Sequence, residues 1–406
     1  MIISLLTFKK RLRVLYELTL KSEVFTKSNS MKASGLLFLF LLIMSCGSPD
    51  NEIIEVDFER ISDNEITLSA IADDITYVTL DNNYPMSIFY GIELFNDTIY
   101  VDEKDNGMFA LDMTGKIIRR YGSRGRGPGE YFYGLRFSID RNDRVIYLLD
   151  RKNILKYSLD GTFLGNISLE KYPGHFSDIK FQDSLIIAFD FNAGNAVYNW
   201  IVIDAEGNLI KGKFNSVPSF KSGWGFRERA YELESSTYYY NVYNDTVFSI
   251  SPDLSYRTSF LFKPSELRWP RHQVDLSERF NYILVNLVLE TRAFIVIQYY
   301  YKKSHMAFID KSNGKSYKVT WEEENGGIIN DLDRGVPFEP IQYLKKEGRE
   351  YLVGYTQALD IISRVHSDDF KNYTPKSPKK KEALSRLAEN LKETDNPLLT
   401  LVRLKN

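Results

Sequence analysis

Residues 142–168 read NDRVIYLLDRKNILKYSLDGTFLGNIS, and the pattern of this stretch decides the fold class. It opens with Asn-Asp, continues with an apolar strand that ends at Asp150, and passes through a short polar turn into a second strand. Asp160-Gly161 then leads into a third strand, because Gly accepts the positive φ that a tight hairpin turn requires. The stretch therefore predicts consecutive short β-strands joined by hairpin turns.

The same pattern recurs along the chain at irregular spacing. Residues 96–122 repeat it closely, with Asp102 in the position of Asp150, and the weaker copies lie at 182–214, 243–262, 294–319 and, incompletely, 349–356. One such sheet cannot bury both of its faces, whereas sheets stacked radially bury them and leave only short edges. Five visible units and a partial one predict an all-β fold, a six-bladed β-propeller over residues 63–406.

A closed propeller ring must be held together where the chain begins and ends, and the incomplete sixth blade needs strands from other parts of the sequence. The strands at 75–81 and 397–405 have no other partner, so we expect both to join the last blade and close the ring. Between them one amphipathic helix is predicted at about 378–394, with Ser377-Pro378 as its start and Asn396-Pro397 as its stop. Its apolar residues fall on one face, which predicts packing on the propeller rim; a partner-binding helix is the alternative. That face comprises Ala383, Leu384, Leu387, Ala388 and Leu391.

The amino-terminal region carries a leader. From Met31 the chain reads MKASGLLFLFLLIMSC, in which a charged start, a short apolar run and a small residue precede the single cysteine, Cys46. This order describes a secretory signal peptide over 31–45, and the run is too short to span a bilayer as a helix. Ile43 to Cys46 resembles the bacterial lipobox, which implies cleavage before Cys46 and its acylation, so the membrane is a predicted partner.

The segments on either side of the leader have simpler interpretations. Residues 1–30 are predicted to be a gene-model extension, or else an unusually long basic leader. Residues 46–62 are polar and acidic and predict a flexible tether. Asp50 and Glu52 resemble the acidic surface-export signal of some Gram-negative lipoproteins. The predicted location is the cell envelope, as an outer-membrane lipoprotein that faces outward.

The glycine-rich stretch YGSRGRGPGEY at 121–131 raises the question of phosphate binding. A phosphate loop opens a helix, but the residues that follow alternate like a strand, and the P-loop lysine is missing. We therefore predict a connection between two blades and no nucleotide ligand. Arg124, Arg126 and Glu130 are candidate ligand contacts at the channel mouth. The structural alternative for Glu130 is that it binds loop amides or pairs with one of these arginines.

The segment 121–161 resembles the NHL-type repeat of six-bladed propellers. The matching residues are Gly122, Gly125, Gly127, Pro128, Gly129, Glu130, Tyr131, Asp140, Ile146, Tyr147, Asp150, Tyr157, Asp160 and Gly161. More closely, the chain is similar to the six-bladed β-propeller lipoproteins of Bacteroidetes, which carry a lipobox, this GxGPGEY loop, and a late helix followed by an Asn-Pro strand. The stretch FYGLRF departs from the NHL pattern, since it lacks the proline that usually follows the aromatic residue of the loop. The resemblance implies the propeller fold over most of 63–406.

Composition and motifs limit the function classes. The net charge of −2 gives no basic face for a nucleic acid, and His175, His272, His305 and His366 show no metal spacing. No G-x-S-x-G elbow is present, so the sequence does not point to an enzyme. Trp224 and Trp269 lie in the insertions near 215–240 and 263–290 and are the candidate exposed contacts for a glycan or protein ligand.

Two functions from different classes remain open at this point. The first is a lipid-anchored binding or scaffolding module of the cell envelope with no cofactor, and a carbohydrate-uptake apparatus is one setting that the family resemblance allows. The alternative is a calcium-dependent lactonase, esterase or lyase that holds the ion in the central channel. An inventory of the channel side chains distinguishes them, because calcium needs several carboxylates or amides and a lysine-lined channel opposes it.

Overall fold

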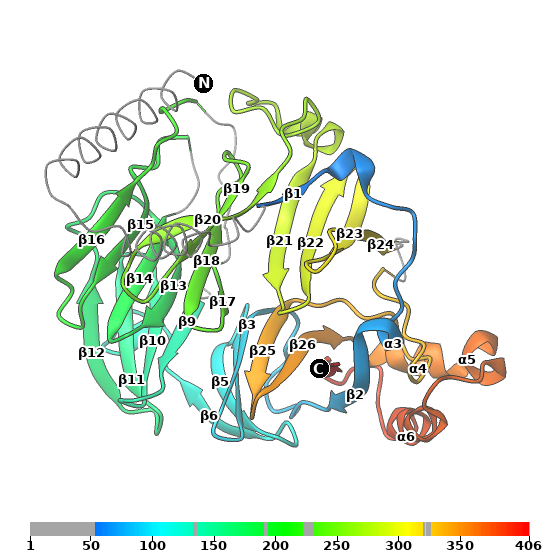
Figure 1. Ribbon diagram of the computed structural model, residues 1–406. Helices are drawn as coiled ribbons and strands as arrows, with labels where there is room; N and C mark the ends of the chain where they lie inside the picture. The colour runs from blue at the N-terminus through cyan, green and yellow to red at the C-terminus, as the bar shows by residue number, and fades with distance from the viewer. Residues whose placement is uncertain are drawn as a thin grey trace, which may run out of the picture. The chain divides into compact units, whose positions relative to one another are not determined.

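The computed structural model describes residues 53–132, 136–190, 194–221, 230–319, 321 and 326–405. In this part of the chain, six sheets of four or five strands are arranged as a six-bladed β-propeller (Figure 1), which confirms the predicted fold class. From the innermost strand outward, blade one has β3 (Phe89–Phe95), β4 (Thr98–Glu103), β5 (Gly107–Asp112) and β6 (Ile117–Tyr121). Blade two has β9 (Arg136–Asp140), β10 (Val145–Asp150), β11 (Asn153–Ser158) and β12 (Phe163–Ser168). Blade three has β13 (Phe176–Gln182), β14 (Leu185–Asp190), β15 (Tyr198–Ile203) and β16 (Leu209–Phe214).

The other three blades follow in chain order. Blade four has β17 (Tyr231–Leu233), β18 (Ser236–Tyr240), β19 (Thr246–Ile250) and β20 (Tyr256–Phe262), with β1 (Ile54–Val56) added outside. Blade five has β21 (Leu284–Glu290), β22 (Phe294–Tyr301), β23 (Lys303–Asp310) and β24 (Ser316–Val319). Blade six has β25 (Gln342–Lys346), β26 (Arg349–Thr356), β27 (Leu398–Leu404) and β2 (Ala72–Val78).

The repeated turn residues have the backbone conformations that the sequence predicts. Asn96 and Asp97 both have positive φ, 48° and 54°, and join β3 to β4 as a two-residue hairpin loop. Gly115 and Gly161, with φ of 86° and 89°, form the later turns of blades one and two. Because Asn, Asp and Gly tolerate this region, the repeat motif marks the hairpins of each blade.

The acidic residue that ends the second strand of a blade has a structural role. Asp150 accepts a hydrogen bond from the backbone N–H of Phe132 at 3.0 Å, and Asp190 accepts one from His175 at 2.8 Å. In blade one, Glu103 accepts a hydrogen bond from the backbone N–H of Ser87 at 3.1 Å. Each carboxylate therefore fixes the segment that leads into the innermost strand of its own blade.

Blade six contains strands from both ends of the described chain. β27 pairs antiparallel with β26, and β2 pairs antiparallel with β27, where Ile75 lies opposite Val402. The predicted ranges 75–81 and 397–405 overlap these strands, but β2 lies a few residues earlier. Ring closure thus rests on hydrogen bonds between β2, near the amino-terminal end of the described chain, and the last strand, β27, rather than on a continuous chain.

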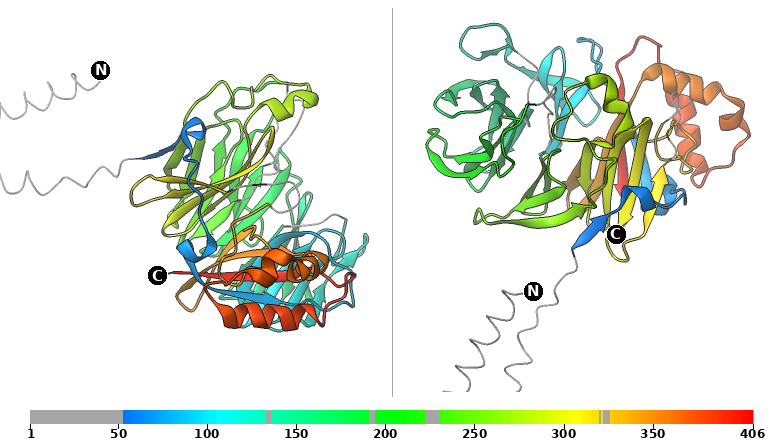
Figure 2. Two further views of the ribbon diagram at one scale, coloured as in Figure 1. Left: turned by 90° about the vertical axis from the view of Figure 1, so that its right-hand side faces the viewer. Right: turned by 90° about the horizontal axis from the view of Figure 1, so that it is seen from above.

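The helical segment between β26 and β27 is larger than the sequence analysis predicts. It comprises α4 (Ala358–His366), α5 (Asp368–Asn372) and α6 (Pro378–Ala388), drawn in orange to red at the outer edge of the propeller (Figure 2). The prediction of one helix over 378–394 was wrong in two respects: α4 and α5 were missed, and α6 ends at Ala388. Leu384 and Ala388 are buried as expected, whereas Ala383 is exposed.

The prediction of a flexible tether over 46–62 was also wrong for its last ten residues, 53–62. β1 pairs parallel with the outer strand β20, with Glu55 opposite Leu261. Beyond it, Glu65 bridges to Lys318 of blade five, and the short helix α3 (Leu68–Ile71) leads into β2. This segment therefore crosses blades four and five before it reaches blade six, because its apolar residues find partners at the outer edges of these sheets.

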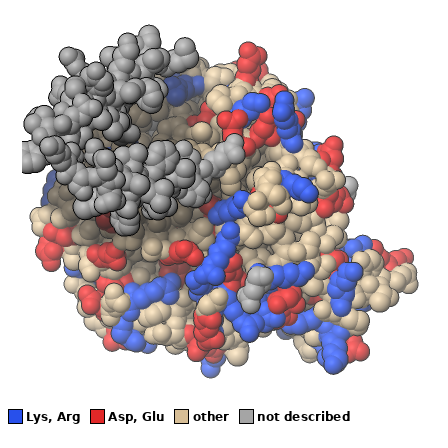
Figure 3. All heavy atoms as spheres, in the orientation of Figure 1, with Lys and Arg blue, Asp and Glu red and all other residues tan. Residues whose placement is uncertain are grey.

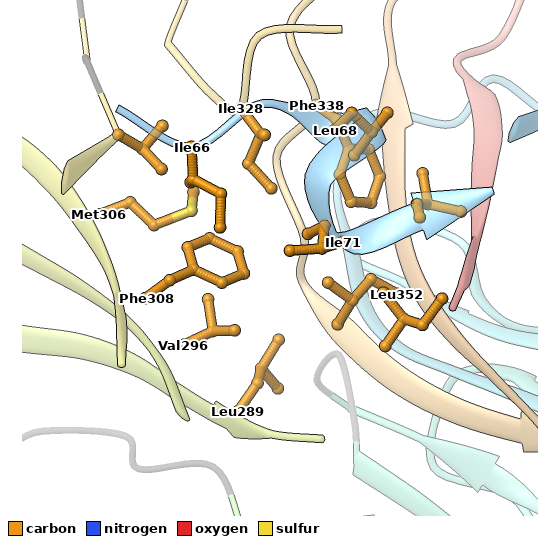
Figure 4. Packing of buried hydrophobic residues seen from close by; sticks show 14 of the residues in the cluster. Ile66, Leu68, Ile71, Leu289, Val296, Met306, Phe308, Ile328, Phe338 and Leu352 are labelled. Atoms are coloured by element: carbon orange, nitrogen blue, oxygen red, sulfur yellow. The ribbon is translucent and has the colours of Figure 1, made fainter. Parts of the chain in front are cut away.

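The interface between blades five and six is packed around this same segment (Figure 4). Ile66, Leu68 and Ile71 insert among side chains of both blades, and Leu68 is fully buried. Phe308 from blade five and Leu352 from blade six have no exposed surface. Burying a side chain of this size contributes about 1.5–3 kcal/mol, so the amino-terminal segment stabilises the closed ring by packing as well as by pairing.

Asn396 connects the carboxyl-terminal strand to blade one. Its side-chain oxygen accepts a hydrogen bond from Met86 N at 2.7 Å, and its amide donates to the carbonyl oxygens of Asp81 and Tyr84, each at 2.7 Å. The residue is 6% exposed. The Asn-Pro pair before the last strand therefore holds the 81–86 segment, in addition to ending the helical region.

Replacement of this side chain is the first prediction. Asn396→Ala leaves an amide and two carbonyl groups without partners, and each such buried group costs about 1–3 kcal/mol. We expect the free energy of unfolding to fall by about 2–4 kcal/mol, measured by chemical denaturation of the full chain. Asn83→Ala, at an exposed position in the same segment, is the control and should change it by less than about 0.5 kcal/mol. Equal losses in the two variants would contradict the assignment.

Candidate functional site

The six innermost strands surround a central channel, and their residues line a cavity of about 30 Å³. A water molecule needs roughly 10–15 Å³ by this measure, so the cavity holds a few waters or the end group of a ligand. Each blade contributes to the wall, with Glu93 from β3, Arg136 from β9, Lys180 from β13, Tyr231 from β17, Leu289 from β21 and Gln342 from β25. All six blades therefore meet at a single site.

Lys180 is the central cation of this site. Lys180 lines the cavity and is only 8% exposed. The ammonium makes no hydrogen bond and no ion pair with any residue that the structure describes. A buried charge without a direct partner is costly, so its stability depends on more distant charges and on what occupies the cavity.

Three carboxylates supply those more distant charges. Burial lowers the pKa of Lys180, but the negative charges of Asp178, Glu232 and Glu93 outweigh it and raise the pKa above its usual value. Lys180 is therefore protonated throughout the neutral range. An ammonium has no lone pair to attack a carbonyl carbon, so this lysine is suited to binding an anion rather than to amine catalysis.

Asp178 is committed to the backbone. Its two oxygens accept hydrogen bonds from Ile179 N at 2.8 Å and from Ala230 N at 2.9 Å. The second bond crosses from blade three to the residue that precedes β17. This carboxylate therefore connects two innermost strands, and neither oxygen contacts Lys180.

Glu93 is the titratable group of the site. Burial, together with the neighbouring charges of Glu232 and Asp178, raises the pKa of its carboxyl group to about 7, although Lys180 and Arg141 act in the opposite direction. Arg141 lies 3.4 Å from one carboxylate oxygen. Since this pKa is close to neutral pH, Glu93 is present both as the acid and as the carboxylate under physiological conditions.

Arg136 places a second cation in the wall, at the first position of β9. Its guanidinium donates to the carbonyl oxygen of Tyr90 and lies 5.1 Å from the centre of the Tyr90 ring. Arg136 and Lys180 come from neighbouring blades and line the same cavity. The arrangement can therefore bind a small charged group and can exchange a proton through Glu93.

The channel offers little to a metal ion. Among the described residues, no group of three or more His, Cys, Asp or Glu side chains is placed to hold one. Lys180 and Arg136 add positive charge to the wall, and like charges repel a divalent cation. The calcium prediction thus gains no support from the wall of the channel.

The loop 121–131 connects blade one to blade two. The amide of Gly127 donates to Glu130 Oε2 at 2.7 Å, as predicted for a loop-stabilising glutamate. Arg124 and Arg126 are exposed, and neither lines the cavity. Arg126 lies instead over the ring of Phe132, 5.8 Å from its centre. The structure therefore does not bring the two predicted arginines to the channel site.

The prediction that Trp269 is an exposed contact was wrong. Trp269 is 5% exposed and packs edge-on against Tyr282, with the ring centres 5.6 Å apart. Its large apolar surface is buried among blade four and blade five residues, which gives more stabilisation than exposure would. Trp224 and Cys46 lie outside the described residues.

Sequence analysis missed the residues that form the channel site. Glu93, Arg136 and Lys180 were not singled out, because each is a single residue in a different strand. The available signal was a charged residue between apolar residues of a strand, as in FYGIELF for Glu93 and, less clearly, IKF of FSDIKFQ for Lys180. Such residues are rarely buried unless paired or functional.

The outer surface carries charges of both signs. On the face shown in Figure 3, Lys and Arg side chains lie among Asp and Glu side chains. This mixture agrees with the net charge of −2. The charged groups that converge from several blades lie in the channel.

These features define a class: a six-bladed β-propeller with a charged site in its central channel. The chain belongs to the family described as Domain of unknown function (DUF4934), whose model matches residues 52–403. No curated protein matches it. Within the described residues, no helix has the length and apolar character needed to cross a membrane.

Solved structures share the fold. A candidate exported protein of Bacteroides fragilis NCTC 9343 is similar with a TM-score of 0.66 and 20% identity, over 87% of this chain and 100% of that one. A member of the DUF4221 family from Bacteroides vulgatus ATCC 8482 is similar with a TM-score of 0.50 and 12% identity, over 85% and 100%. At these identities the likeness concerns the fold alone.

The second prediction concerns Glu93. Its folded-state pKa of about 7 exceeds the ordinary 4.5, so the folded chain is favoured below pH 4.5 and loses this contribution as the pH rises through 7. Glu93→Gln removes the titration. Above pH 7 we expect this variant to be more stable than the natural chain by up to about 3 kcal/mol, from 1.36 kcal/mol per pKa unit.

Chemical denaturation between pH 4.5 and pH 8 measures this difference. The two proteins should converge in stability at the acidic end of the range. Glu170→Gln, at an exposed position, is the control and should show no such divergence. A constant difference between Glu93→Gln and the natural chain across the whole range would exclude the raised pKa.

Proposed function

We propose that this protein is a lipid-anchored, exported β-propeller of the cell envelope that binds a small ligand in its central channel. Two observations support the anchor and the location. The leader ends in a lipobox-like sequence at Cys46, and a structural relative is named as a candidate exported protein. The acyl chains on Cys46 then hold the propeller at the outer membrane, and Asp50 and Glu52 favour its display on the outer side.

The observation that carries the binding function is the ammonium of Lys180, which has no hydrogen-bond or ion-pair partner among the described residues. A purely structural lysine at 8% exposure would be expected to have a carboxylate or carbonyl partner. Lys180 is one of the residues that line a cavity to which all six blades contribute. A ligand that enters the cavity can supply the missing partner, and the rigid ring holds the site ready for it.

A calcium-dependent lactonase, esterase or lyase is the weaker candidate. It requires carboxylate or amide oxygens that are free to converge on an ion. Asp178 uses both oxygens on backbone amides, and Glu93 lies beside Arg141. The cations of the wall favour an anion over calcium.

The third prediction tests the anchor. Cys46→Ser removes the acylation site, so the full chain expressed in its bacterial host should leave the membrane fraction and fail to incorporate labelled palmitate. Ser48→Ala, two residues away, should leave both properties unchanged. Undiminished membrane partition of Cys46→Ser would contradict the proposed anchor, whatever the channel binds.

The fourth prediction tests the channel as the binding site. Gln342→Trp places a large ring at the wall of the cavity, so ligands that bind there should be excluded. We expect any small molecule that binds the full chain in a one-to-one ratio, found by calorimetric screening of neutral, cationic and anionic compounds, to lose at least about tenfold in affinity.

A matched variant separates blocking of the channel from general damage. Gln357→Trp introduces the same ring at an exposed position before α4 and should bind like the natural chain. Ligands that bind the two tryptophan variants equally well would place the binding site outside the channel. A screen that yields no ligand of any charge would overturn the binding function.

A further inference from the structure

We propose that the channel site recognises an oxyanion, a carboxylate or phosphate group of a small molecule, which Lys180 and Arg136 bind together. This inference rests on the proposed function and specifies the chemistry of the ligand. It concerns the end group that enters the cavity and not the rest of the molecule. The volume of about 30 Å³ suits such a group and is too small for a sugar ring or a peptide.

The first argument is the availability of donors. The Lys180 ammonium has three N–H donors, and none of them has a partner among the described residues. Toward the described residues, the Arg136 guanidinium donates through one nitrogen, to the carbonyl of Tyr90, and its fork carries further N–H groups. Two cations on one cavity wall with donors that no described residue accepts are the arrangement that binds an oxyanion.

The second argument is the repulsion between the two cations. Arg136 is close enough to Lys180 for its charge to disfavour the protonated ammonium. Both residues nevertheless line the same cavity. An anion between them would convert this repulsion into two attractive contacts, and in a site with little water these contacts are stronger than at the surface.

The third argument is that the nearby carboxylates are engaged elsewhere. Asp178 accepts two backbone N–H groups, and Glu93 lies 3.4 Å from Arg141. Glu232 acts on Lys180 only through its charge. These groups stabilise the ammonium from a distance and leave its donors to the ligand.

The same carboxylates make binding depend on pH. Glu93 faces Lys180, Asp178, Glu232 and Arg141, and these are the charged groups around it. Protonation of Glu93 removes a negative charge that competes with the ligand for Lys180. With a pKa of about 7, affinity for an anion should fall up to about tenfold between pH 6 and pH 8, since the protonated fraction falls by that factor.

The experiment uses the purified full chain and four probes: propionate, its neutral isostere propionamide, inorganic phosphate and calcium. Calorimetry and thermal unfolding are measured at pH 6 and pH 8. We expect propionate or phosphate to bind and raise the Tm, more strongly at pH 6, and propionamide to have no effect. The first two probes distinguish a carboxylate ligand from a phosphate ligand.

Charge variants test the residues involved. Lys180→Met keeps the aliphatic stem and removes the ammonium, so affinity for the bound anion should fall by at least about tenfold, the loss of one charge-assisted contact. Lys379→Met, at an exposed position on α6, is the control and should bind normally. Arg136→Gln provides a second variant should Lys180→Met fail to fold, and Glu93→Gln should bind equally at pH 6 and pH 8.

Several outcomes overturn the inference. Equal binding of propionamide, binding of calcium in place of the anions, or anion affinity that survives both Lys180→Met and Arg136→Gln would each exclude an oxyanion site here. If the anions fail but a neutral or cationic compound binds in the channel, the proposed binding function stands and only this inference fails. If nothing binds in the channel, both fail.

Discussion

The propeller depends on the antiparallel pairing of β2 with β27, because this is where two distant parts of the chain are joined without a covalent connection within the blade. Each innermost strand borders the channel, and its position is set by the two blades beside it. A ring held open at blade six would relax the packing between blades five and six, where Leu68 is fully buried. The channel site is therefore a consequence of closure, since its wall takes residues from every blade.

The chain reinforces this closure with contacts that lie far apart in the sequence. β1 adds to blade four, the 65–71 segment packs between blades five and six, and Asn396 ties the last strand to the segment before blade one. The contacts are of three kinds: backbone pairing, apolar burial and side-chain capping of backbone groups. Because they act on blades four, five, six and one, the ring is fastened at several places rather than at a single seam.

Much of this fold could be predicted from the sequence, because its elements are encoded locally. The Asn-Asp and Asp-Gly turns require positive φ at fixed places, so the strands between them could be recognised. The missed helix α4 had a local signal as well, since Ala358, Ile361, Ile362 and Val365 follow the i, i+3, i+4, i+7 spacing of one helical face. The ordered 53–62 segment had no such signal, because its structure depends on the edge of β20, two hundred residues away.

The site was harder to predict for a physical reason. The channel collects a few residues from each of six innermost strands, so no short stretch of sequence contains the site. The glycine-rich loop drew attention because it is local, yet its Glu130 serves the loop itself. Trp269 misled in a similar way, since a position in an insertion does not determine whether a ring is exposed. A charged residue between apolar residues of a strand is a more reliable sign of a channel site, because charged side chains are rarely buried without a partner or a function.

The distribution of charge around the ring adds a final constraint. The acidic and basic residues of the cavity come from β3, β9 and β13, while β21 contributes only Leu287, Val288 and Leu289. Six blades of similar backbone thus produce a channel whose charged lining residues all come from the three neighbouring strands β3, β9 and β13, while the lining residues of β17, β21 and β25 are uncharged. A symmetric ion at the axis would not use this arrangement, whereas a ligand with one charged end would, because the ring itself fixes the direction in which that end points.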